Sequence, residues 1–139
     1  MKADNKNSTG FEDFMRLRLQ ASTDFVEGKF DALKHISVEQ SPATIFPPAG
    51  NCIQGANLVN KFNEEGAANF LPGAKNEFEI MHQGADEHIA YWTGIQRSTV
   101  KMKGKDQDIT FNLRITEIFR KENGEWKLMH RHADKLEEQ

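Results

Sequence analysis

The chain has 139 residues, and its 18 basic and 21 acidic side chains give a net charge of −3 and an isoelectric point near 6.0. This length predicts a single domain, and an acidic chain without a sustained basic run does not have the charge pattern of a nucleic-acid or membrane-surface binder. The lone cysteine, Cys52, excludes an intrachain disulfide and a thiolate metal site.

The start of the chain is polar and has no apolar stretch typical of a secretion signal or a membrane span. We therefore expect a cytoplasmic protein with a flexible N-terminus over residues 1–9 and one domain over residues 10–139.

The N-terminal half shows helical periodicity. Residues that recur at spacings of three and four between Phe11 and Val26, Arg18 among them, predict an amphipathic helix that ends near Gly28. A short helix over residues 30–36 follows almost without a linker. The next predicted elements are short strands at 43–46 and 52–54, a helix over 55–65 capped by Gly66, and a loop over 67–76.

After residue 76 the pattern changes to period two. It predicts strands over residues 77–83 and 88–103, then a hairpin of residues 108–121 and 125–134 joined at Asn123-Gly124, a strong signal for a tight reversal. Strands this long cannot lie flat over a small core. We expect an α+β fold in which a curved, bulged antiparallel sheet surrounds the helices.

One acidic residue interrupts the apolar face of the first hairpin strand. Phe111, Leu113, Ile115 and Phe119 alternate along this face, and Glu117 stands among them. A buried carboxylate is costly unless it is paired, hydrogen-bonded or protonated. Glu117 therefore either has a partner or lines a polar pocket.

The partner of Glu117 depends on the length of the hairpin loop. A three-residue loop places Met129 opposite Glu117 and Arg131 diagonally within reach, which gives an ion pair. A two-residue loop places His130 opposite and gives a carboxylate and imidazole pair that could act as a general base.

The aromatic residues of the sheet are further candidates. Tyr91 shares parity with Thr93 and two isoleucines, so we expect Tyr91 and Thr93 to face inward. Trp92 and Trp126 are then expected on the outer surface of the sheet, covered by a second subunit.

Three stretches have a recognisable order of residues: RITEIFRKENGEWKLMHRHAD at 114–134, IAYWTG at 89–94 and FPPAGNCIQGANLV at 46–59. They resemble the SnoaL-like family of the nuclear transport factor 2-like superfamily, which includes ketosteroid isomerase and has the cystatin-like fold. The resemblance spans about residues 11–134. It implies a cone-shaped α+β fold with three N-terminal helices packed in a strongly curved antiparallel sheet.

The resemblance does not carry over the ketosteroid isomerase residues. The isomerase base, an Asp, falls on Phe46, the oxyanion Tyr near Ala21, and the oxyanion Asp on or beside Thr116. We therefore do not expect that reaction. The kinase II association domain, a relative, places the positions matching Glu117 and Ala133 in one cavity, which favours the three-residue loop.

The expected function is that of a dimeric domain whose largely apolar pocket binds a small apolar or weakly polar molecule, with or without acid and base chemistry. The alternative is a non-catalytic association or ligand-sensing module. We expect a homodimer through the sheet face, and neither a cofactor nor a metal, since His130 and His132 have no evident third ligand. The predicted ligand-binding residues are Tyr91, Thr93, Glu117, Met129, His130 and Arg131.

Overall fold

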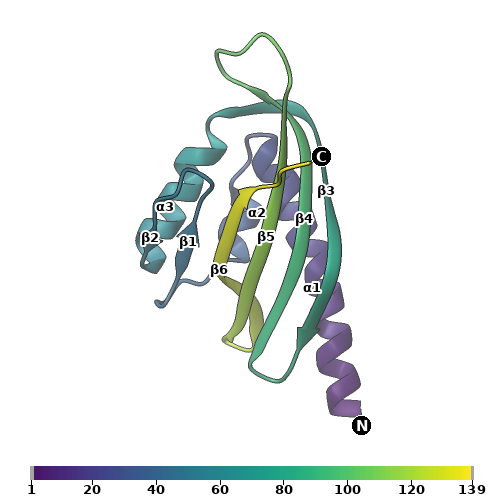
Figure 1. The fold of residues 1–139 in the computed structure, drawn as a ribbon. Helices are drawn as coiled ribbons and strands as arrows, with labels where there is room; N and C mark the ends of the chain where they lie inside the picture. The colour runs from purple at the N-terminus through teal and green to yellow at the C-terminus, as the bar shows by residue number, and fades with distance from the viewer. Residues whose placement is uncertain (1, 139) are drawn as a thin grey trace.

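A computed structural model of the chain describes the backbone of residues 2–138 and the side chains of residues 10–138. Three helices precede and interleave with six strands (Figure 1). The elements are α1 (Lys2–Val26), α2 (Asp31–His35), β1 (Thr44–Phe46), β2 (Ile53–Gln54), α3 (Ala56–Ala67), β3 (Phe70–Ala85), β4 (Ile89–Met102), β5 (Ile109–Glu122) and β6 (Glu125–Lys135). Among the described helices, none combines the length and the hydropathy that crossing a bilayer needs.

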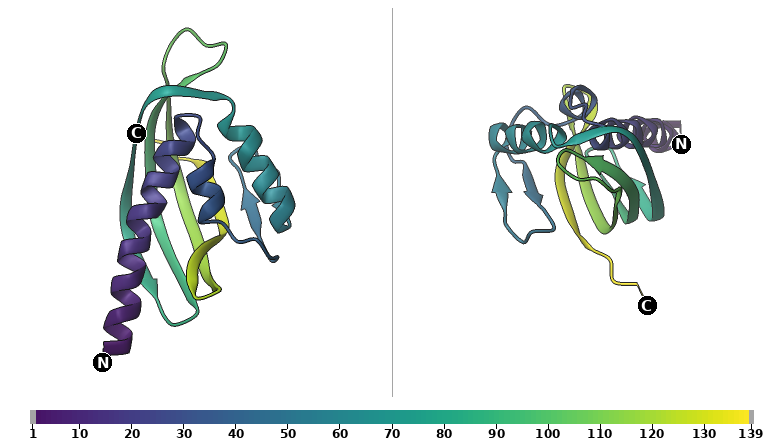
Figure 2. Two further views of the ribbon diagram at one scale, coloured as in Figure 1. Left: turned by 180° about the vertical axis from the view of Figure 1, so that it is seen from behind. Right: turned by 90° about the horizontal axis from the view of Figure 1, so that it is seen from above.

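The strands form one sheet in the order β2-β1-β6-β5-β4-β3. Strands β3 to β6 make an antiparallel meander, and β1 joins its free edge parallel to β6. The helices lie together on one side of the sheet, which curves beneath them (Figure 2). The expected α+β fold with a curved sheet around the helices is confirmed.

Three element boundaries differ from those predicted. Helix α1 begins at Lys2 rather than near residue 11, so helix runs through the stretch expected to be a flexible start. Gly66 lies inside α3 rather than at its cap. The predicted loop over 67–76 is mostly strand, because β3 starts at Phe70 and accommodates Pro72-Gly73 in an irregularity of its pairing with β4. An edge strand tolerates a proline, which donates no ladder hydrogen bond.

The hairpin of β5 and β6 has the two-residue loop, with Asn123 and Gly124 at φ 55° and 80° and Glu122 opposite Glu125. The preference for a three-residue loop was wrong. Neither residue predicted to stand directly opposite Glu117, Met129 or His130, is correct, because the register shifts by one residue between Ile118 and Phe119. This bulge brings Arg131 directly opposite Glu117. The predicted ion pair between Glu117 and Arg131 is present.

Strand β4 faces the opposite way to the prediction. Trp92 is fully buried beneath the helices, whereas the Tyr91 hydroxyl lies 2.9 Å from His82 Nδ1 and Thr93 hydrogen-bonds the hydroxyl of Thr116 across the outer face. Both faces of this strand carry large side chains, so alternation alone could not decide between them. The inward orientation expected for Tyr91 and Thr93 was wrong.

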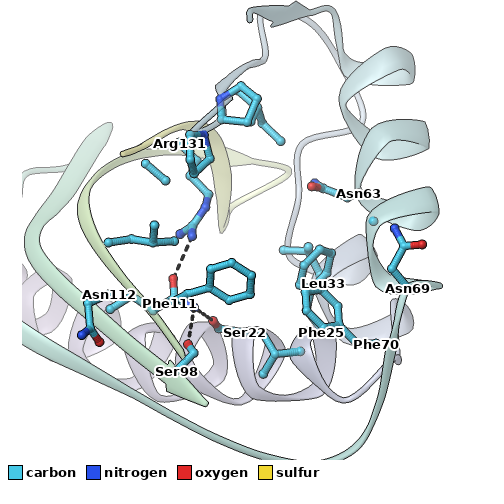
Figure 3. Close-up of a pocket in the computed structure, with 18 of the residues that line it drawn as sticks. Ser22, Phe25, Leu33, Asn63, Asn69, Phe70, Ser98, Phe111, Asn112 and Arg131 are labelled. Carbon is cyan, nitrogen blue, oxygen red and sulfur yellow. Dashed lines mark hydrogen bonds between the residues drawn. The ribbon is translucent and has the colours of Figure 1, made fainter. Parts of the chain in front are cut away.

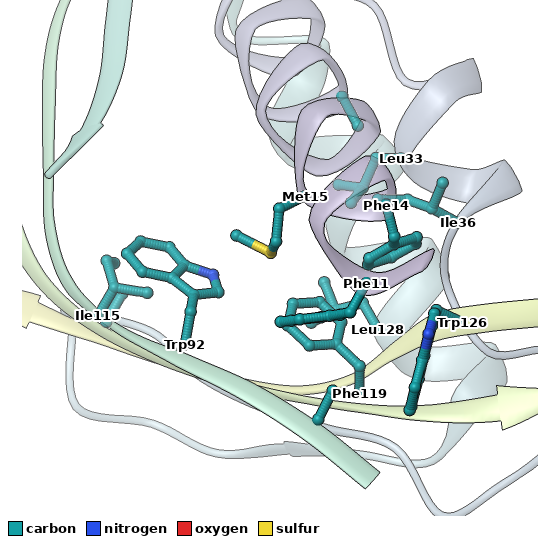
Figure 4. Close-up of a cluster of buried hydrophobic side chains, with 13 residues drawn as sticks. Phe11, Phe14, Met15, Leu33, Ile36, Trp92, Ile115, Phe119, Trp126 and Leu128 are labelled. Atoms are coloured by element: carbon teal, nitrogen blue, oxygen red, sulfur yellow. The ribbon is translucent and has the colours of Figure 1, made fainter. Parts of the chain in front are cut away.

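The tryptophans belong to the core of the same chain (Figure 4). Trp126 packs edge-on against Phe11, and Trp92 stacks on Phe78 with ring centroids 4.5 Å apart. Trp92 and Trp126 are 0% and 7% exposed. Neither tryptophan requires a second subunit to cover it, contrary to the expectation.

At position 94 the sheet has no room for a side chain, so only glycine fits there. A Cβ on Gly94 would lie 2.0 Å from the carbonyl oxygen of Glu79, next to the pairing irregularity of β3 near Met81. Gly94→Ala should therefore lower the free energy of unfolding by about 2 kcal/mol or more. Urea unfolding measures the change. Gly10→Ala, where a Cβ would meet no atom within 4 Å, is the control and should be neutral or stabilising. An unchanged stability of Gly94→Ala would contradict the close approach of β3 and β4.

Candidate ligand-binding site

Glu117 is the centre of a buried cluster of charged side chains. Arg18 donates from Nε to Oε1 at 2.8 Å and from Nη2 to Oε2 at 2.7 Å. Trp92 Nε1 donates to Oε1 at 2.7 Å, and Arg131 Nη1 donates to Oε2 at 2.7 Å. The carboxylate, with no exposed surface, thus accepts four hydrogen bonds and has no acceptor position left over.

The charge state of Glu117 follows from these contacts. Burial by itself would raise the pKa of the carboxyl group, but the charges and hydrogen bonds of Arg18 and Arg131 outweigh burial and hold the pKa at about 2. Glu117 is therefore ionised at neutral pH. A carboxylate this acidic, fully enclosed and fully hydrogen-bonded, is a poor general base.

A chain of side-chain hydrogen bonds orients Arg131 from its other side. Arg131 Nη2 donates to Gln96 Oε1 at 2.7 Å, and Gln96 Nε2 donates in turn to Asn76 Oδ1 at 3.0 Å. Ser98 donates to the same Asn76 oxygen at 2.6 Å. The guanidinium is thus fixed between Glu117 and Gln96, and burial lowers its pKa while the charge of Glu117 raises it.

A cavity of about 740 Å³ lies between the helices and the sheet, and it is lined by Arg18 and Arg131 but not by Glu117. Helices α1, α2 and α3 and strands β1, β3, β4, β5 and β6 all contribute to its wall. Most lining side chains are apolar: Phe25, Val26, Leu33, Ile45, Phe62, Phe70, Met102, Phe111, Leu113, Leu128 and Leu136. A cavity of this size and lining is typical of small-molecule sites.

Polar side chains line part of the cavity, and Arg131 and Asn63 reach it from different elements (Figure 3). Arg131 on β6, labelled in Figure 3, is 18% exposed and donates a hydrogen bond to Gln96. Asn63 on α3 is 7% exposed and points toward the cavity.

The predicted site residues do not lie together in one place. Glu117 and Arg131 lie together, but only Arg131 lines the cavity. Tyr91 and Thr93 lie on the outer face, as described above. Met129 packs in a second apolar cluster with Val38 and Ile45.

His130 lies outside the cavity as well. Its Nδ1 is 2.6 Å from the hydroxyl of Thr44, and its ring contacts Phe46 edge-on. Burial, followed by the charge of His132, lowers the pKa of His130. His130 and Glu117 do not form the base pair that the two-residue loop predicted.

Arg18 and Asn63 line the cavity but were not among the predicted site residues. Arg18 could have been found, because it recurs with the apolar residues of α1 and a cation on a buried face needs a counter-charge as much as Glu117 does. Asn63 carried no such signal, since an asparagine in a short helix is ordinary on the surface.

Comparison with known proteins identifies the family of the chain. Residues 18–133 match the family described as the SnoaL-like domain, which covers most of the chain. No curated protein matches the chain.

Solved structures share the fold at low identity. A protein from Streptomyces avermitilis named as a dehydratase of the nuclear transport factor 2-like family is 16% identical, with a TM-score of 0.76 over 92% of this chain and 97% of that one. One from Novosphingobium aromaticivorans named as a scytalone dehydratase is 15% identical, with a TM-score of 0.77 over 99% and 89%. The calcium/calmodulin-dependent kinase II hub homology domain of Chlamydomonas reinhardtii is 15% identical, with a TM-score of 0.65 over 89% and 96%. These likenesses show the fold alone.

The cluster predicts how substitutions at Glu117 affect stability. Glu117→Gln removes the charge that two buried guanidiniums share, so the free energy of unfolding should fall by about 3 kcal/mol or more. Adding Arg131→Met should recover part of the loss, because one unpaired cation is removed. Urea unfolding of the parent, the single variant and the double variant measures both steps. A single variant as stable as the parent would contradict the buried ion cluster.

The cluster also predicts a dependence on pH. The folded-state pKa of Glu117, about 2, lies below its ordinary value of 4.5, so its stabilisation is complete above about pH 4.5 and is lost as the pH falls toward 2. The titration of Glu117 accounts for about 3 kcal/mol of the free energy of unfolding. The variant with both Glu117→Gln and Arg131→Met lacks this carboxyl group and should lose that much less stability between pH 5 and pH 2. If the parent and the double variant lost the same stability between pH 5 and pH 2, the lowered pKa of Glu117 would be contradicted.

Proposed function

We propose that this chain, which belongs to the SnoaL-like domain family, binds a small and largely apolar organic molecule in the cavity between its helices and its sheet. The observation that carries the proposal is the cavity itself. Its apolar wall supplies the free energy of binding, and a few fixed polar groups, above all Arg131, supply orientation.

The lining favours binding over acid and base catalysis. Among the residues that line the cavity there is no aspartate, glutamate, histidine, tyrosine or cysteine, and the ionisable ones are Arg18, Arg131 and Lys135. Guanidinium groups stay protonated at neutral pH and do not accept protons. The acid closest to the site, Glu117, is enclosed. We therefore propose a binding or ligand-sensing role without turnover of the ligand.

Pairing with a second copy of the chain remains part of the proposal. The outer face of the sheet, with Tyr91, Thr93, Thr116 and the exposed Ile89, is the surface that such pairing would use. Trp92 and Trp126 cannot anchor it, because both are buried within the chain.

An uncharged fluorescent probe tests the proposed function. N-phenyl-1-naphthylamine should bind saturably to the parent protein, with the rise in emission that follows transfer into an apolar site. Leu113→Trp replaces an isobutyl group of the cavity wall by a bulkier indole and should weaken binding by about tenfold or more, through loss of room for the probe. Thr116→Trp, on the outer face of the same strand, is the matched control and should bind as the parent does. Equal binding by both variants, or no saturable binding by the parent, would overturn the proposed function.

A further inference from the structure

The charge of the cavity wall has the opposite sign to that of the protein. The chain carries a net charge of −3, yet the residues that line the cavity include three cations, Arg18, Arg131 and Lys135, and no acid. Lys135 is exposed, whereas the two arginines are held at the base of the cavity by Glu117. A negative protein has thus concentrated positive charge at one internal surface.

The single carboxylate does not neutralise both guanidiniums. Glu117 is the one acid in contact with Arg18 and Arg131 among the described residues, so the cluster carries one positive charge in excess. The amide of Gln96 supplies a hydrogen-bond acceptor to Arg131 but no charge. A buried excess charge is costly without a counter-ion.

The guanidiniums also retain unused donors. Arg18 Nη1 is buried and has no hydrogen-bond partner in the described structure. Arg131 uses two of the five N–H groups that a guanidinium carries, and its exposed part lies at the cavity. Buried donors of this kind are nearly always satisfied in folded proteins, by protein, water or ligand.

We propose that the ligand is an organic monoanion, an apolar body with one carboxylate group, and that Arg131 binds the carboxylate while the apolar wall receives the body. This inference rests on the proposed function and specifies its ligand class. The ligand carboxylate supplies the charge that Glu117 leaves uncompensated, and a planar guanidinium matches a carboxylate in geometry. Lys135, exposed at the cavity, adds attraction for an anion that approaches from solvent.

Matched acids and amides test this ligand class on the unaltered protein. The probes are 1-naphthaleneacetate with 1-naphthaleneacetamide, and octanoate with octanamide, each pair alike in shape and different in charge. Calorimetry near pH 7 should give an affinity for the acid about tenfold or more above that for its amide in at least one pair, the weight of a hydrogen bond between charged groups.

Substitution of Arg131 assigns the preference to this site. Arg131→Met leaves Glu117 paired with Arg18, and it should reduce the preference for the acid to about threefold or less while amide binding persists. Arg114→Met removes an exposed arginine that pairs with Asp134, and it should leave the preference unchanged. Amide binding by Arg131→Met shows at once whether that variant keeps the cavity.

The outcomes separate the two proposals. Equal affinity for acid and amide in both pairs would overturn the monoanion inference and leave the proposed function intact. An acid preference that survives Arg131→Met would also overturn the inference, because the charge would be recognised elsewhere. If neither pair binds but N-phenyl-1-naphthylamine does, the inference again fails alone. If none of these compounds binds, both proposals fail.

Discussion

The enclosed carboxylate of Glu117 is the constraint on which the rest of the site depends. An isolated carboxylate at this depth would be neutral or would destabilise the fold, but two guanidiniums and the indole N–H of Trp92 satisfy it completely. In return, the carboxylate fixes Arg18 on α1 and Arg131 on β6, two elements far apart in the sequence. The cluster therefore joins the first helix to the last strand and forms the polar base of a cavity that is otherwise apolar.

The geometry of this cluster depends on a bulge that the sequence did not reveal. The Asn123-Gly124 turn, the long period-two strands and the preceding helices were all predictable, because short-range turn chemistry and hydrophobic periodicity determine them. The register beyond the turn was not, since the shift between Ile118 and Phe119 turns Arg131 rather than His130 toward Glu117. Such a shift is a result of packing between strands and helices, and no local pattern encodes it.

The candidate site, too, was predictable from the sequence only in part. Glu117 and Arg131 could be identified from the sequence, because a charge on an apolar face needs a partner nearby. Tyr91 and Thr93 could not be placed correctly, because Ile89 and Tyr91 on one face of β4 look as apolar as Ala90 and Trp92 on the other. An apolar pocket was expected, but the residues of its wall lay beyond prediction, since the wall combines residues from eight elements and the cavity volume depends on where packing leaves a gap.

A crystal structure of the protein with 1-naphthaleneacetate tests the central claim most directly, namely that the Glu117 cluster presents Arg131 to an apolar ligand cavity. The account predicts the naphthalene ring among the apolar side chains of the wall, the carboxylate within hydrogen-bond distance of Arg131, and Glu117 still bonded to both arginines. A ligand bound outside the cavity, or Arg131 turned away from Glu117 with the cavity filled by protein side chains, would contradict the account.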